Sequence, residues 1–322
     1  MMQRIPTYRA FGLRTLSERL NVFVRTMQEV RELKDEDAIH DLRVASRRFH
    51  AATLLFSDSL PSLVLANAER RIRRVRKSAG EVRDGDVQME FIAALMKRKK
   101  ALRYRAGLER LLLRLSQRRE KQMKQISTAM DTFDRSTAST DVHKAVQMGI
   151  TRQPGIRTLP LRHRSGQAIV LALNALLRYE QYIRQSSATA ELHQMRIAAK
   201  RLRYVMEIFN PVYGGKLKPF IHTIRSLQDA LGLMHDCDVW LSMIPEFIEE
   251  ERLRTGKFFG ATSTFPRIER GLLFLTDYVR VERMKQYRKF VRIWNEAGMN
   301  SVWKAIAKVT VSPPRTFVHP MP

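Results

Sequence analysis

Two short segments of the sequence carry cationic side chains at the spacing of one helical face. The first segment begins at residue 39 with IHDLRVASRRFHAATLLF, and the second begins at residue 192 with LHQMRIAAKRLRYVMEIF. On a helix with about 100° per residue, the cations of each segment span an arc of about 80° that faces away from most of the apolar residues. We call these two sets the cationic stripes. They are His40, Arg43, Arg47 and His50 in the first segment, and His193, Arg196, Lys200 and Arg203 in the second.

Neither stripe contains an acidic residue, although a solvated helix face usually mixes both signs. Cations stacked one turn apart repel one another unless an anion neutralises them. Guanidinium groups offer forked pairs of donors that suit phosphate oxygens. We therefore predict that the stripes bind a polyanion such as a polyphosphate chain, and a plain solvated face is the alternative interpretation.

A second basic segment follows each stripe. Arg73 and Arg225 occupy matched positions in these segments, and we predict that both contact the anion. The histidines that open the stripes, His40 and His193, have three interpretations: anion contact, structural hydrogen bonding and metal binding. Anion contact is favoured, because a nearby phosphate stabilises the protonated ring.

Arg48 and Arg201 fall in the apolar arcs of their helices, where an unpaired charge would be costly. We expect each of them to pair with an aspartate of a D-x-D motif, and thus to have a structural role. An alternative role for these carboxylates is to cap free backbone N–H groups at a helix start. The motif aspartates are Asp84 and Asp86 in the first copy, and Asp236 and Asp238 in the second.

The elements that carry these residues are predicted to be helices throughout, so the expected fold class is all-α. Apolar residues recur at three- and four-residue spacing, good helix formers dominate, and strand-like alternation is absent. The predicted helices cover residues 9–33, 38–56, 66–78, 87–130, 167–184, 190–209, 218–231, 239–255 and 276–308.

An internal duplication organises these helices. The two stripe segments align at an offset of 153 residues, and AGEVRDGDV from residue 79 aligns with LGLMHDCDV from residue 231 at an offset of 152. Two matches at nearly one offset predict two antiparallel helical bundles related by a pseudo-twofold axis. We expect the first repeat at residues 7–135, a connector at 136–164 with a short helix near 142–148, the second repeat at 165–308, and a flexible tail at 309–322.

Composition favours a polyanionic partner. Lys and Arg number 58 against 32 acidic residues, which gives a formal net charge of +26 and costs stability by self-repulsion. The single cysteine, Cys237, excludes an intramolecular disulfide. No apolar run is long enough to cross a bilayer and no secretion signal is recognisable, so a cytoplasmic protein without a membrane partner is expected.

The motifs resemble those of the CHAD family, the conserved-histidine α-helical domain. HDLRVASRR at His40 and HQMRIAAKRLR at His193 match, as do GEVRDGDV and LGLMHDCDV, and the resemblance covers roughly residues 7–308. It implies two helical bundles around a basic cavity that binds inorganic polyphosphate, and association with polyphosphate granules in bacteria. The positions to which it assigns polyphosphate binding are His40, Arg43, Arg47, Arg73, His193, Arg196, Lys200 and Arg225.

We expect a non-catalytic protein without a cofactor or a metal. The sequence contains no P-loop, no paired-carboxylate metal site and no Ser or Cys nucleophile with a placed base. His235 and Cys237 could suggest a metal site, but Arg83 and Gly85 replace them in the first copy. The alternative function is nucleic-acid binding, although no DNA-binding motif is recognisable; weak non-specific binding at low salt is expected in any case.

Overall fold

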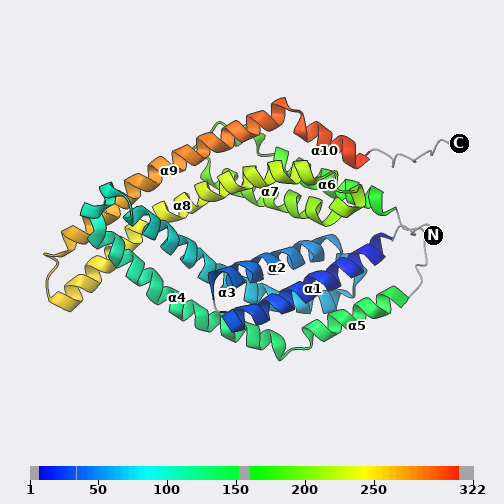
Figure 1. Cartoon of the computed structure of the whole chain (residues 1–322), viewed down its shortest axis with the longest axis horizontal. Coiled ribbons are helices and arrows are strands. Elements are labelled where there is room, and N and C mark those ends of the chain that lie inside the picture. The colour runs from blue at the N-terminus through cyan, green and yellow to red at the C-terminus, as the bar shows by residue number, and fades with distance from the viewer. Residues whose placement is uncertain (1–6, 34, 152–159, 312–322) are drawn as a thin grey trace. The chain divides into compact units, whose positions relative to one another are not determined.

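Every regular element in the described part of the chain is a helix, which confirms the all-α fold class (Figure 1). A computed structural model describes residues 7–33, 35–151 and 160–311. The α-helices are α1 (Tyr8–Leu33), α2 (Glu36–Leu55), α3 (Ser62–Met96), α4 (Arg105–Asp134), α5 (Ala138–Thr151), α6 (Leu161–Leu177), α7 (Thr189–Phe209), α8 (Lys218–Phe259), α9 (Phe265–Met299) and α10 (Val302–Val311). The short 3₁₀ helices are η1 (Ser57–Ser59), η2 (Lys99–Tyr104), η3 (Glu180–Tyr182) and η4 (Asn210–Tyr213).

The chain divides into two compact units. The two longest helices of the second predicted repeat, α8 and α9, each contribute residues to both units. Within the described residues, the larger unit contains 9–33, 35–151 and 233–286, and the smaller unit contains 7–8, 160–232 and 287–311. The division therefore falls inside α8 and inside α9. The repeat boundaries, the pseudo-twofold relation and a shared basic cavity stay predictions. The predicted tail lies outside the described residues from position 312 onward, and so does part of the connector, 152–159.

In the larger unit, α3 packs along α2 and α4. The face of α2 that turns toward this core carries Ile39, Leu42 and Phe49, all fully buried. Burial of such side chains supplies about 1.5–3 kcal/mol each, which fixes the rotation of α2 about its axis. The stripe of α2 is thereby directed away from the core.

A second apolar cluster in the larger unit lies between α4, α8 and α9. Leu108, Trp240 and Leu275 belong to this cluster. Two glycines allow the start of α4 to touch α9, since a Cβ on either Gly107 or Gly271 would lie 2.8 Å from the Cα of the other. Any larger residue at these two positions would force the helices apart.

In the smaller unit, α6 packs against α7 and α10. The hydroxyl of Tyr213, in η4, lies 3.1 Å from the Ser165 hydroxyl of α6 and 3.4 Å from the Thr310 carbonyl of α10. The buried side chains of α7 include Leu192, Met195 and Leu202. As in α2, burial of this face directs the cationic stripe of α7 outward.

The structure corrects the prediction that helices are interrupted at the second pair of matched motifs. Helix α3 runs without a break through residues 79–87, and α8 runs through 231–239. A helical glycine such as Gly80 or Gly85 costs only about 1 kcal/mol, and the burial of neighbours such as Val82 offsets that cost. The interruption lies instead at η2, inside the segment 87–130 that was predicted to be one helix.

Other segments also differ from the predicted elements, among them α6, which was predicted at 167–184. Helix α5 is longer than the short helix expected near 142–148. Helix α9 begins at Phe265, eleven residues before the predicted start at 276, and a separate α10 follows it. Ser301, with φ 52°, lies in the left-handed region between these two helices, which ends the regular α9 geometry there.

Candidate functional site

The first cationic stripe lies on the side of α2 opposite its buried face. His40 is exposed, and Arg43 and Arg47 are half-buried. Long charged side chains commonly pack their apolar stems against protein, which agrees with the partial burial of these two arginines. Arg73, in the first half of α3, is exposed and forms no ion pair within the described residues.

The second cationic stripe repeats this pattern on α7. His193, Arg196 and Lys200 are half-buried, and 15% of the Arg203 side chain is exposed. Arg225, near the start of α8, is exposed. Each of the two units thus contains one helix with the predicted separation of apolar and cationic faces.

Acids approach both stripes, which corrects the interpretation of the stripes as purely cationic. Arg43 forms an ion pair of 2.8 Å with Asp84 of α3, whose side chain is 65% exposed. On α7, Glu207 lies 3.5 Å from Arg203 and 3.8 Å from Arg225. The stripes themselves contain no acid, but Asp84 comes from a neighbouring helix and Glu207 from the next turn of α7. A bound polyanion must therefore compete with these carboxylates.

The first stripe also has an acid neighbour at its C-terminal end. Nδ1 of His50 lies 2.6 Å from Glu69 of α3, and the same carboxylate lies 3.3 Å from Arg76. Glu69 thus links α2 to α3 beside the stripe. This part of the first repeat is better suited to helix packing than to anion capture.

The two matched arginines lie over matched glycines. A Cβ at Gly80 of α3 would meet Nε of Arg43 at 3.9 Å, and a Cβ at Gly232 of α8 would meet Nε of Arg196 at 3.6 Å. Both glycines lie inside helices, and Nε of each arginine lies within van der Waals reach of the space that a Cβ would occupy. We call these two contacts the arginine seats. The same contact occurs at corresponding positions of the two predicted repeats.

Two of the D-x-D aspartates pair with arginines that were not predicted as partners, and the predicted pairing of Arg48 stays a prediction. Nε of Arg119 in α4 lies 2.5 Å from Asp86, whose side chain is fully buried. Asp238 of α8 pairs in the same way with Arg283 of α9. Arg201 is exposed rather than enclosed in an apolar arc, and Arg48 is half-buried.

The continuity of α3 explains this correction. Asp84 and Asp86 are two positions apart in the middle of a helix, so their side chains point about 200° apart. Asp84 therefore reaches α2 and Asp86 reaches α4. Capping of a helix start is also excluded for this pair, because α3 begins at Ser62.

A sequence signal for the buried pairs existed but was missed. REKQ at 119–122 and RMKQ at 283–286 share the pattern R-x-K-Q. Each begins with the arginine that pairs with an aspartate and ends with a buried glutamine, Gln122 or Gln286. The offset of 164 residues differs from the offset of the other matched motifs, so an alignment at one fixed offset does not find it.

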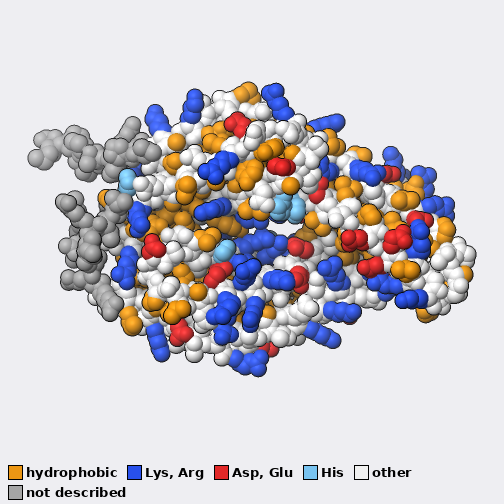
Figure 2. All heavy atoms as spheres, turned by 180° about the vertical axis from the view of Figure 1, so that it is seen from behind, with side chains coloured by type: hydrophobic (Ala, Val, Ile, Leu, Met, Phe, Trp, Pro, Cys, Tyr) orange, Lys and Arg blue, Asp and Glu red, His pale blue; other side chains and the backbone are white. Residues whose placement is uncertain are grey.

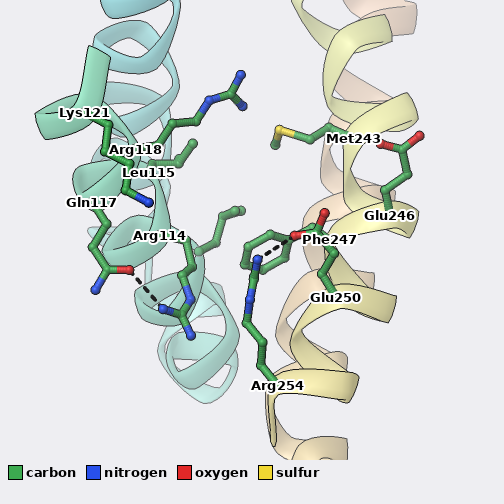
Figure 3. A pocket seen from close by; sticks show the side chains of 11 residues that line it. Arg114, Leu115, Gln117, Arg118, Lys121, Met243, Glu246, Phe247, Glu250 and Arg254 are labelled. Carbon is green, nitrogen blue, oxygen red and sulfur yellow. Dashed lines mark hydrogen bonds and ion pairs between the residues drawn. The ribbon is translucent and has the colours of Figure 1, made fainter. Parts of the chain in front are cut away.

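A pocket of about 460 Å³ lies between α4 and α8 of the larger unit, and it contains none of the predicted site residues (Figure 3). Leu115, Met243 and Phe247 provide apolar walls, and Arg118 and Lys121 lie on its α4 side (Figure 3). Glu246 and Glu250 lie on the α8 side. The apolar interior of the pocket is therefore bordered by cations on α4 and by acids on α8.

Glu251, which is fully buried beside this pocket, holds its arginines in place. It pairs with Arg114 at 2.7 Å and with Arg254 at 2.6 Å. Burial acts to raise the pKa of Glu251, but the hydrogen bonds from Arg114 and Arg254 outweigh it and leave the pKa below its usual value. These two arginines are thus already neutralised, and we assign them to the packing of α4 on α8.

Cys237 has the properties of a core residue. It is 4% exposed, and burial, with Glu282 and the two motif aspartates adding to it, raises the pKa of the thiol to about 12. The thiol is therefore protonated at neutral pH, whereas the thiolate is the nucleophilic form. Within residues 7–33, 35–151 and 160–311, no group of three or more His, Cys, Asp or Glu side chains could hold a metal ion.

The stripes, the arginine seats and the Asp86–Arg119 pair lie in a segment with a recognisable family signature, and Arg283 of the second buried pair lies beyond it. The family model described as CHAD domain matches residues 14–245. This chain belongs to the CHAD domain family. The match confirms the resemblance to this family that the sequence motifs indicated.

The solved structures that resemble the chain include the following two. PptA from Streptomyces chartreusis is similar with a TM-score of 0.60 and 17% identity, over 90% of this chain and 99% of that one. The crystal structure of the CHAD domain from the plant Ricinus communis gives a TM-score of 0.57 and 17% identity, over 97% of this chain and 94% of that one. At these identities the likeness establishes the fold. No curated protein sequence matches the chain.

Lys and Arg side chains are spread over the whole face shown in Figure 2, among smaller numbers of Asp and Glu. This distribution agrees with the net charge of +26. None of the described helices has an apolar stretch that could span a membrane.

Proposed function

We propose that this protein binds inorganic polyphosphate through the cationic stripes of α2 and α7 without cleaving it. Membership of the CHAD family supports a role related to polyphosphate. The observation that carries the proposal is the pair of arginine seats, Arg43 over Gly80 and Arg196 over Gly232. An arginine that is already held in one orientation loses less side-chain entropy when an anion binds, so more of its interaction energy appears as affinity.

The chemistry of binding is an exchange of carboxylate for phosphate. Arg43 donates to Asp84 in the free protein, but Asp84 is largely exposed, and an exposed ion pair contributes only about 0–1 kcal/mol. A phosphate group can accept the forked donors of one arginine and a further donor from the next turn of the stripe. We therefore expect polyphosphate to share or replace the Asp84 contact.

The first test is a binding titration with long-chain polyphosphate at about 0.15 M salt, where non-specific nucleic-acid binding is weak. The variant is Arg43→Ala combined with Arg196→Ala. Loss of two charge-assisted contacts of about 1.5–3 kcal/mol each should weaken binding by at least about 100-fold. The double variant Arg25→Ala, Arg280→Ala is the matched control. It removes the same charge from arginines whose side chains are 68% and 66% exposed, and we expect it to bind within a few-fold of the wild type.

Two results would argue against this function. Equal weakening by the two double variants would mean that only net charge matters. Equal competition by double-stranded DNA or RNA would favour the second candidate, a nucleic-acid-binding protein, which the net charge of +26 makes reasonable.

The absence of catalysis is a separate part of the proposal. Incubation of polyphosphate with the protein and Mg²⁺ or Mn²⁺ should release no phosphate above the rate without protein. Release that depends on the protein would instead assign it an enzymatic role. We further propose association with polyphosphate granules, for which a fluorescent fusion of the wild type should co-localise with polyphosphate and the Arg43→Ala, Arg196→Ala variant should not.

A further inference from the structure

The turn between α8 and α9 displays two neighbouring phenylalanines to solvent. Phe258 and Phe259 are 82% and 61% exposed, and their rings meet edge to face with centroids 4.8 Å apart. The turn lies at the left-hand end of the larger unit in Figure 1, between the yellow and orange helices. Exposed single apolar residues are ordinary, but two adjacent aromatic rings at the end of a helix pair are costly to leave in water.

The backbone of this turn is ordered, so the exposure does not result from a frayed end. The N–H of Gly260 donates to the Gly256 carbonyl at 2.9 Å, and the N–H of Phe265 donates to the Thr262 carbonyl at 3.0 Å. Gly260 has φ 70°, a left-handed conformation that suits glycine. Phe265, on the other side of the turn, is 2% exposed in the apolar core. The fold therefore buries Phe265 and leaves Phe258 and Phe259 outside.

The charge around the two rings has one sign. The segment 252–268 contains four cations and no acid. Lys257 and Arg267 form no ion pair in the part of the chain that the structure describes, whereas Arg252 and Arg254 pair with glutamates behind the turn. Two exposed rings with two nearby cations in the same segment complement a surface that is anionic outside and apolar beneath.

We propose that the α8–α9 turn docks this protein on an anionic lipid surface, with Phe258 and Phe259 inserted among the headgroups. The apolar helix faces are occupied by the core, and the turn lies beyond those faces, so docking of the turn needs no helix that spans the bilayer. A projecting turn offers a protein partner little area, while it needs only shallow insertion to bury two rings in a bilayer. Lys257 and Arg267 can then reach lipid phosphates, as cations at membrane interfaces do.

The test is co-sedimentation with vesicles of phosphatidylcholine containing phosphatidylglycerol, at about 0.15 M salt and without polyphosphate. Phe258→Ala combined with Phe259→Ala leaves the net charge unchanged, so it separates ring insertion from general attraction by a basic protein. We expect this variant to bind these vesicles at least about tenfold more weakly than the wild type, since two rings lose their burial. Lys257→Gln and Arg267→Gln should each weaken binding by about fivefold.

The matched control removes two exposed leucines elsewhere, Leu63→Ala with Leu171→Ala, whose side chains are 84% and 64% exposed. It should bind the anionic vesicles as the wild type does. Equal vesicle binding by the wild type and the Phe258→Ala, Phe259→Ala variant would overturn the proposal. So would self-association of the wild type, measured by sedimentation without vesicles and abolished in that variant, because the rings would then dock on a second copy.

Discussion

At the scale of single residues, the charge of this protein is organised by a small number of buried or seated arginines. Arg43 and Arg196 lie over helix glycines, and Arg119 and Arg283 pair with the D-x-D aspartates Asp86 and Asp238. The first kind of arginine is the one we propose to bind an anion. The second kind is paired inside the fold, where it contributes to packing.

The buried pair of the first repeat gives a stability prediction. Arg119→Ala leaves the fully buried carboxylate of Asp86 without its arginine partner, and an uncompensated buried charge is expected to lower the free energy of unfolding by about 3 kcal/mol. The neighbouring Arg118→Ala is the control, because Arg118 is exposed and its loss should change stability by less than about 0.5 kcal/mol. Denaturant unfolding of both variants measures the difference, and equal stabilities would show that Asp86 needs no partner.

At the scale of the element, long continuous helices bring the site residues together. Because α3 does not break at its glycines, it presents Gly80 and Asp84 one turn apart on the side that meets Arg43. The second copy has the same spacing in α8, between Gly232 and Asp236. A helix interruption at either place would have separated the seat from its acid.

The arginine seats predict that polyphosphate binding depends on the size of the side chain at position 80, and not on the loss of the glycine itself. Gly80→Ala should keep polyphosphate affinity and stabilise the protein by about 1 kcal/mol, since the added Cβ would stand 3.9 Å from Arg43 in ordinary contact. Gly80→Leu should push the guanidinium off the helix and weaken binding by about tenfold, with the fold retained. Titration with polyphosphate and thermal unfolding of the two variants test this. Unchanged affinity in Gly80→Leu would show that the seat has no part in binding.

The sequence predicted the stripes, because a helical period exposes a row of cations that no core could accept. It also predicted that Asp86 and Asp238 would be paired. It did not identify Arg119 and Arg283, since a partner from another helix depends on packing that local periodicity does not encode. The interruption at η2 was missed for a similar reason, because the Lys- and Arg-rich segment 97–105 has good helix-forming composition and the bend follows from packing.

At the scale of the whole molecule, net charge and specific site make different contributions to binding. A charge of +26 attracts any polyanion, and that attraction falls as salt screens it. Under the proposed function, the arginine seats add phosphate contacts, and each contact should release counterions. The slope of affinity against salt therefore reports the number of contacts, whereas affinity at one salt concentration mixes both contributions.

This difference gives the last prediction. The logarithm of polyphosphate affinity should fall linearly with the logarithm of salt concentration, and Arg43→Ala with Arg196→Ala should reduce the slope by roughly 1.4, about 0.7 for each lost contact to a single chain. The exposed pair Arg25→Ala, Arg280→Ala removes the same charge but should leave the slope unchanged. Titrations from about 50 to 200 mM salt measure all three proteins. If both double variants lowered affinity by the same factor and kept the wild-type slope, the polyanion would be held by the overall field of the molecule and not by the stripes of α2 and α7.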